Sequence, residues 1–284
     1  MMRFLAEVVH SLKIRVPRGS IWAAVFILVL WCGGAAGQTY PGLHDGDDVY
    51  GIDARLYSTP WTNSTIINLL GLGETNSSLY ANVRFSIYGI STGAELTNQA
   101  AIDVSGTGGN AYSNEGPTYA FVDAYGIYGL RDRGVEITNS GNITVTAEGG
   151  YAEADGFAAQ AHAIVYGISA DETITNTGVI DVSASGGTAT ASDNTTSVDA
   201  EGVAYGLYSS DNIINDGQIT VSATGGAATS SGETPSAHAY ASAFGIYADN
   251  GIQNTGDLTV IATGGTADGI TNTMASAIAQ AMTS

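Results

Sequence analysis

Residues 174–182 read Ile174-Thr175-Asn176-Thr177-Gly178-Val179-Ile180-Asp181-Val182, and this phrase decides the fold of the chain. The same pattern, aliphatic-x-Asn-x-Gly-x-aliphatic-x-Val, occurs at 137–145, 213–221 and 252–260, and at 96–104 with alanine in place of the glycine. Within each phrase apolar residues alternate with polar ones, as in Ile143-Thr144-Val145-Thr146-Ala147. Alternation of this kind with β-branched residues is typical of a half-buried strand and excludes an amphipathic helix.

An aromatic-Gly-aliphatic triplet precedes each phrase and sets the length of a repeat. Successive triplets are spaced by 38, 37, 41, 39 and 39 residues, and a glycine pair closes each later unit. Five units from Tyr88 onward are complete, and a sixth is truncated. The triplets are Tyr50-Gly51-Ile52, Tyr88-Gly89-Ile90, Tyr125-Gly126-Ile127, Tyr166-Gly167-Ile168, Tyr205-Gly206-Leu207 and Phe244-Gly245-Ile246.

Several strands per repeat, with glycine, asparagine and aspartate between them, indicate an all-β fold in which identical units stack. We therefore predict a right-handed parallel β-helix. A repeat of about 39 residues is twice the length that we expect for one rung, so we interpret each unit as two rungs. At about 4.8 Å per rung, six units would form a rod about 60 Å long.

Alternation before the triplets predicts which side chains face the core. Ala120, Val122 and Ala124 and their equivalents in other units are expected to point inward. The outward face is expected to be mixed, with Asp123, Gln160, His162, Asp199, Glu201, His238 and Tyr240. In the triplet the aromatic and the aliphatic residue both fall on the outward register, so we expect a bulge at the glycine that turns the strand.

One asparagine per unit precedes a turn, at Asn98, Asn139, Asn176, Asn215 and Asn254. An asparagine side chain can bond the local backbone of a turn and also stack on its equivalent in the next unit. We expect these five residues to form a structural ladder and not a ligand site.

The first 37 residues are typical of a secretory signal peptide. Basic residues precede an apolar run at 21–31, which is too short to span a bilayer, and small residues follow up to Gly37. We expect cleavage after Gly37, an atypical capping region at 38–87, and β-helix repeats at 88–284. Adding 39 residues to Phe244 places the next triplet near residue 283, so we also expect this chain to be part of a longer reading frame.

The composition after Gly37 excludes several partners. This part has 4 arginines, no lysine and 26 acidic residues, which is a formal charge of −22. Such a charge repels nucleic acids and anionic lipid surfaces. The single cysteine, Cys32, lies in the predicted signal, so disulfides cannot stabilise the exported part.

Exported, cysteine-free, acidic repeats with phrases such as 174–182 resemble the passenger domains of bacterial autotransporters. The resemblance covers residues 88–284 and the signal. It implies adhesion or surface display, a location at the cell surface, at the outer membrane or in the extracellular space, and glycans or proteins of host or neighbouring cells as partners. It also implies a C-terminal outer-membrane barrel as the carrier, which is not found in this sequence.

Candidate catalytic and metal motifs are weak. Gly89-Ile90-Ser91-Thr92-Gly93 matches the nucleophile elbow of hydrolases, but no helix follows it, and the equivalent position of Ser91 varies among units. His44-Asp45-Gly46-Asp47-Asp48 is rich in oxygen ligands but lacks the spacing of a Ca²⁺ loop. We expect no catalytic residue, no metal and no cofactor.

The sequence leaves three functions open. The first is a non-enzymatic surface adhesin or structural passenger, which we expect. The second is a glycan-active β-helix enzyme, a polysaccharide lyase or hydrolase, which needs paired carboxylates or a Ca²⁺-assisted basic residue. The third is a separately secreted matrix protein.

Overall fold

A computed structural model describes residues 38–43, 46–192, 197–231, 236–269 and 272–283. The predicted signal peptide at 1–37 lies outside the described residues. All regular elements in the described ranges are strands, numbered β1 to β26, and no helix there is long and apolar enough to cross a membrane.

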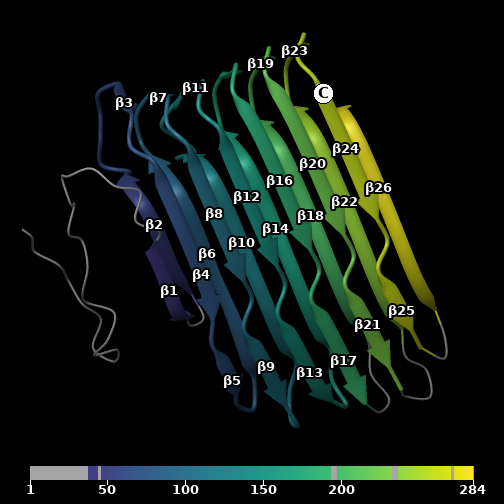
Figure 1. The fold of residues 1–284 in the computed structure, drawn as a ribbon. Helices are drawn as coiled ribbons and strands as arrows, with labels where there is room; N and C mark the ends of the chain where they lie inside the picture. The colour runs from purple at the N-terminus through teal and green to yellow at the C-terminus, as the bar shows by residue number, and fades with distance from the viewer. Residues whose placement is uncertain (1–37, 44–45, 193–196, 232–235, 270–271, 284) are drawn as a thin grey trace, which may run out of the picture. The chain divides into compact units, whose positions relative to one another are not determined.

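The chain forms a parallel β-solenoid in which the repeat of about 39 residues makes one turn (Figure 1). Every strand pairs in parallel with the corresponding strand of the next unit, as Ile143 pairs with Ile180 and Ile180 with Ile219. The interpretation of two rungs per repeat is therefore wrong. Each repeat closes a single long circuit with four strands, and about six turns at roughly 4.8 Å each extend about 30 Å along the axis.

The two larger sheets contain seven strands each. Sheet A consists of β1 (Gln38–Leu43), β4 (Ile67–Gly73), β8 (Ile102–Thr107), β12 (Ile143–Glu148), β16 (Val179–Ser185), β20 (Gln218–Thr224) and β24 (Leu258–Thr263). Sheet B consists of β2 (Asp47–Ala54), β6 (Ala81–Thr92), β10 (Thr118–Gly129), β14 (Ala159–Ala170), β18 (Val198–Ser209), β22 (Ala237–Ala248) and β26 (Thr273–Thr283).

The two smaller sheets contain six short strands each and complete the turn. Sheet C consists of β3 (Trp61–Asn63), β7 (Leu96–Asn98), β11 (Ile137–Asn139), β15 (Ile174–Asn176), β19 (Ile213–Asn215) and β23 (Ile252–Asn254). Sheet D consists of β5 (Thr75–Ser77), β9 (Asn110–Ser113), β13 (Tyr151–Asp155), β17 (Thr188–Ser192), β21 (Ala227–Ser230) and β25 (Thr266–Asp268).

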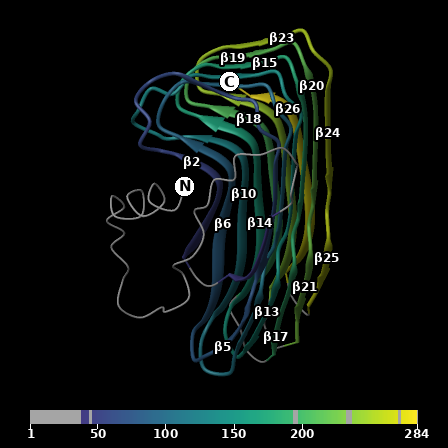
Figure 2. The same ribbon diagram turned by 60° about the vertical axis from the view of Figure 1, so that its left-hand side comes forward.

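The turn is flattened, because sheet B packs against sheets A and D (Figure 2). Between sheets A, B and C lies a core of isoleucine, valine and leucine, with Ile143, Ile180 and Ile219 at 0–1% exposure. The space between sheets B and D is narrower and is filled almost entirely by alanine, such as Ala120, Ala152 and Ala189. The inward register predicted before the triplets is correct, since Ala120, Val122 and Ala124 are fully buried.

At the triplet the strand bends without a bulge. Tyr125 stays half-buried on the outer face, while Gly126 and Ile127 both turn into the core, where Ile127 is 0% exposed. The register between neighbouring units continues through this point, from Tyr125–Tyr166 to Ile127–Ile168. A Cβ atom at Gly126 would lie 2.5 Å from the carbonyl oxygen of Gly167, so only glycine allows the turns to approach at the bend.

The region from Gln38 to Ile87, expected to be an atypical cap, contributes strands to all four sheets. Strands β2, β3, β4 and β5 form a first turn in register with the second, despite the departure of their sequence from the repeat. Strand β1 lies beyond this turn and pairs only with β4 of sheet A.

Replacing one core residue tests the assignment of the two faces of sheet A. Ile180→Asp should lower the free energy of unfolding by more than about 4 kcal/mol, because it places an unpaired carboxylate in the apolar core. Its neighbour Asp181 is exposed, so Asp181→Ala should change stability by less than about 0.5 kcal/mol. Chemical denaturation followed by circular dichroism measures both, and similar midpoints for the two variants would contradict the assignment.

Candidate functional site

The asparagines of sheet C form one continuous hydrogen-bonded ladder through the solenoid. The Nδ2 of each residue donates to the Oδ1 of the next at 2.6–2.8 Å, in the order Asn63, Asn98, Asn139, Asn176, Asn215 and Asn254. The same Nδ2 also donates to a backbone carbonyl two residues later, for example from Asn139 to Gly141 at 3.0 Å. From Asn63 to Asn215 both amide protons are thus used, so this part of the ladder holds the turn and the stack together and leaves no donor for a ligand.

The aromatic residues of the triplets form a second ladder, on the outer face of sheet B. The rings of Tyr50, Tyr88, Tyr125, Tyr166, Tyr205 and Phe244 stack with centroids 4.7–4.9 Å apart and planes within 11° of parallel. This distance equals the strand spacing, so in-register pairing brings the rings together. Burial raises the pKa of Tyr125 and of Tyr166 above the ordinary value.

Stacking covers the faces of these rings. From Tyr88 to Tyr205 each ring has a stacked neighbour on both sides, so only ring edges reach the surface. A sugar binds an aromatic residue through the ring face, because its C–H groups pack on the π system. The triplet column is therefore a structural feature and a poor platform for sugars.

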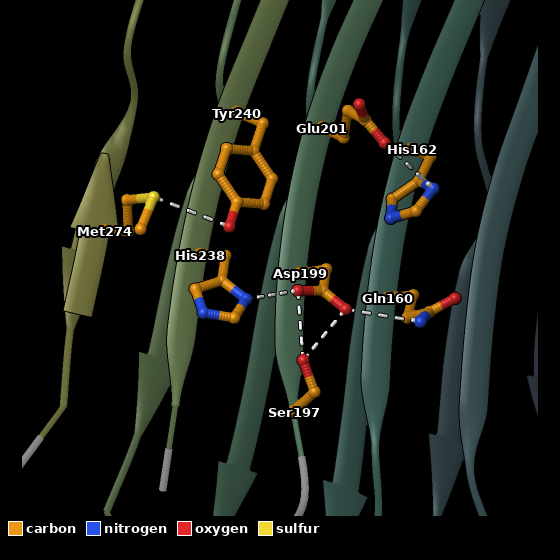
Figure 3. Close-up of polar contacts among 8 residues, drawn as sticks. All are labelled: Gln160, His162, Ser197, Asp199, Glu201, His238, Tyr240 and Met274. Carbon is orange, nitrogen blue, oxygen red and sulfur yellow. Dashed lines mark hydrogen bonds and ion pairs between the residues drawn. The ribbon is translucent and has the colours of Figure 1, made fainter. Parts of the chain in front are cut away.

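A polar cluster lies beside this column on strands β14, β18 and β22 (Figure 3). Its centre is Asp199, whose carboxylate is 2.9 Å from Nδ1 of His238 and accepts hydrogen bonds from the Ser197 hydroxyl at 3.0 Å and from Nε2 of Gln160 at 3.3 Å. The ring of His238 stacks on Tyr240 with centroids 5.3 Å apart. Asp199 therefore orients the imidazole of His238.

A second half of the cluster involves His162 and Glu201. Nδ1 of His162 is 3.9 Å from Oε2 of Glu201, and its ring stacks on Phe121 with centroids 4.6 Å apart. Burial lowers the pKa of His162 to about 4, so this imidazole is neutral at pH 7. Burial and the charge of Asp199 raise the pKa of the Glu201 carboxyl.

Another outward carboxylate is more buried than its register predicted. Asp123 is 6% exposed, and its carboxylate lies 3.0 Å from a guanidinium nitrogen of Arg84. Burial raises the pKa of Asp123, and the hydrogen bond from Arg84 counteracts part of that rise.

The hydrolase-like motif at 89–93 and the acidic stretch at 44–48 contribute no residue to this cluster. Ser91 is in strand β6 and is 1% exposed, and its Oγ has no hydrogen-bond partner in the described part of the chain. Of the acidic stretch 44–48, residues 44 and 45 lie outside the described ranges, and the carboxylate of Asp48 accepts a hydrogen bond from Tyr50 at 3.0 Å. Among the described residues, no three His, Cys, Asp or Glu side chains are placed to hold a metal ion.

Sequence reasoning placed the cluster residues on the outward face but did not bring them together. His162 and His238 stand at different offsets from their triplets and do not stack on each other, but Glu201 and Asp199 of the intervening strand contact one each. Applying the 39-residue register to polar positions finds the columns: Gln160, Asp199 and His238 are in register, as are His162, Glu201 and Tyr240. Asn63 was missed because its unit lacks the full phrase.

Comparison with protein-family models, with curated proteins and with solved structures gives no match for this chain. Its function must therefore be argued from its own residues.

Breaking the asparagine ladder in the middle should lower the free energy of unfolding. Asn176→Ala removes the bond to Gly178 and leaves Nδ2 of Asn139 and Oδ1 of Asn215 without ladder partners in the interior. We expect this variant to lose about 3 kcal/mol of unfolding free energy. The matched variant Asn254→Ala, at the half-exposed end, breaks only one ladder bond and should cost about 1 kcal/mol. Denaturant titration separates the two, and equal costs would mean that the ladder does not act as a unit.

Acidification should destabilise the protein through His162. The pKa in the folded state is about 4 and the ordinary value is 6.5, so only the unfolded chain binds this proton between the two. Stability is then lost as pH falls from 6.5 to 4, by up to about 3 kcal/mol. In His162→Phe, which keeps the ring on Phe121, the slope of stability against pH should flatten.

Glu201 changes the pH dependence of stability in the direction opposite to His162 and provides the control for that prediction. Its pKa is raised in the folded state, so protonation favours folding as pH falls through that value toward 4.5. Glu201→Gln should therefore steepen the acid loss of stability. Thermal melts from pH 7 to pH 4 measure both slopes, and an unchanged slope in His162→Phe would refute the assignment.

Proposed function

We propose that this chain is an exported, non-catalytic β-solenoid that works at the cell surface in adhesion or display, as the passenger part of an autotransporter. The observation that carries the proposal is the pair of continuous ladders, one of asparagine and one of aromatic rings. Both run through successive turns without interruption. A stack of this kind stays rigid without disulfides, and the exported part has no cysteine.

Electrostatics support a surface role of this type. A charge of −22 on residues 38–284 keeps such rods soluble and apart from one another and from anionic lipid. The acids are spread over the turns, and residues 38–284 contain four arginines and no lysine.

Export and surface exposure provide the direct test. Mass spectrometry of the protein from its native cell should find a mature N-terminus at Gln38, within two residues. An antibody raised against residues 88–284 should label intact cells, and deletion of the gene should reduce attachment of those cells to surfaces. A full-length, cytoplasmic chain would refute the proposal, and release of the rod without a carrier would favour the matrix protein.

A second candidate function is favoured by one observation, the pairing of Asp199 with Glu201. The two residues lie two apart on one face of β18, so their Cα atoms are about 6.6 Å apart. Asp199 contributes to the raised pKa of Glu201. Glycoside hydrolysis uses two carboxyl groups near the scissile bond, one of them an acid with a raised pKa.

Turnover assays distinguish this candidate from the first. If the cluster hydrolyses glycans, the purified chain should release reducing ends from a polysaccharide, and both Glu201→Gln and Asp199→Asn should abolish the activity. Gln160→Ala removes one hydrogen bond to Asp199 and should reduce turnover only moderately. If no reducing ends are released from a panel of neutral and acidic polysaccharides, the hydrolase candidate is refuted and the non-catalytic function remains.

A further inference from the structure

A hollow of about 330 Å³ lies on the outer surface where sheet A meets sheet D. The strands of sheet D that border it are β9, β13, β17 and β21, which are successive strands of the sheet, and the last three can be followed in Figure 2. Its lining includes Glu148, Gly150, Tyr151, Gly187, Thr188 and Ala227. A hollow of this size is at the lower end of the range for small-molecule sites.

The glycine pairs of the repeat create the floor of this hollow. A Cβ atom at Gly187 would lie 2.0 Å from the carbonyl oxygen of Gly150, and one at Gly226 would lie 1.9 Å from that of Gly187. Close approach of successive turns therefore excludes side chains at this corner. The result is a strip of bare backbone that repeats at each turn from the second onward, because the first turn has Gly73-Glu74 at this corner.

The wall of the hollow comes from a change of residue size along one register position. Tyr151 is in register with Thr188, and Thr188 with Ala227, so a tall side chain is followed by two short ones. In the triplet column of sheet B, by contrast, every register position from one turn to the next is occupied by an aromatic ring. In the described strands Tyr151 is the one aromatic residue of this column, because Asn110 precedes it in register, and the hollow lies around this single ring.

Tyr151 keeps one ring face free of aromatic neighbours. In the described residues the only ring in contact with it is that of Tyr112, at a centroid distance of 5.4 Å and a tilt of 38°. The next strand offers Thr188, a residue without a ring, at the equivalent position, and the side chain of Thr190 on that strand hydrogen-bonds Tyr151. This distinguishes Tyr151 from Tyr125 and Tyr166, whose rings are stacked on both sides.

Polar groups beside the ring are suited to hydroxyl ligands. The Tyr151 hydroxyl donates to Glu153 at 3.1 Å, and the exposed carboxylate of Glu148 lines the hollow together with Thr188. Carboxylates accept hydrogen bonds from sugar hydroxyls, and the flat C–H face of a pyranose packs on an aromatic face. The same carboxylates repel uronic, sialic or sulfated sugars.

We propose that this hollow binds a pyranose unit of a polysaccharide that carries no negative charge, with one sugar face on the ring of Tyr151 and its hydroxyls bonded to Glu148 and Thr188. The inference rests on the proposed function, because it names the ligand class of the surface rod. Repetition of the glycine corner lets an extended glycan continue along the axis past Thr188 and Ala227.

Calorimetric titration of the purified chain with cellohexaose and with chitohexaose tests the proposal, with a polygalacturonate oligomer as the acidic probe. At least one neutral probe should bind, and the acidic probe should not. Tyr151→Ala should weaken binding at least about tenfold. Thr188→Tyr should do the same by stacking on Tyr151 and filling the hollow, without loss of thermal stability, since two tyrosines in register on neighbouring strands stack, as Tyr125 and Tyr166 do on sheet B.

The matched control is Tyr119→Ala, which removes a half-buried outward tyrosine of sheet B that contacts Phe121. It should leave binding unchanged. Equal loss in Tyr119→Ala, retained binding in Thr188→Tyr, preference for the acidic probe, or no binding of either neutral probe would overturn the inference. Surface labelling and attachment of intact cells with no sugar binding would refute this site alone, whereas a cytoplasmic chain would refute the proposed function.

Discussion

In-register parallel stacking at the strand spacing is the constraint on which the rest of this structure depends. Within the strands, each residue of an inner turn lies beside its equivalent in the turns before and after, about 4.8 Å away. A residue type is therefore stable in the stack only if it tolerates its neighbours at that distance. Isoleucine in the core, asparagine in sheet C and aromatic rings on sheet B gain from contact with their own kind, and each forms a column through the solenoid.

The same constraint explains how so acidic a chain can fold in this way. Like charges directly opposite in neighbouring strands destabilise a sheet. In the register pairs of the described strands no acid faces another acid: Asp199 lies between Gln160 and His238, and Glu201 lies between His162 and Tyr240. Asp181 lies between two threonines. The acids of the strands are thus staggered around the turn, and each is separated from like charge along its own column, whereas Glu95 and Glu136 follow one another at the turn before sheet C.

Departures from the regular columns also explain the two surfaces on which we base functional proposals. Where a charged residue interrupts a column, its neighbours supply hydrogen bonds, and the cluster around Asp199 is the result. Where an aromatic residue has a short residue after it, a ring face stays open, and the hollow beside Tyr151 is the result. In both places a repeat position departs from its column, so individual features arise from variation within a regular stack.

The sequence by itself determined the strands, the repeat of about 39 residues and the inward face, because alternation and periodicity are local properties of the chain. It did not determine the number of turns per repeat: the pairing partner of Ile180 is 39 residues away, and only the closed circuit decided that all four strands belong to one turn. The bend at Gly126 and the burial of Asp123 depended on tertiary contacts with Gly167 and Arg84. The cluster around Asp199 and the hollow at Tyr151 were also decided only by the tertiary structure. Each combines residues of successive turns, whose approach depends on the register of the whole stack.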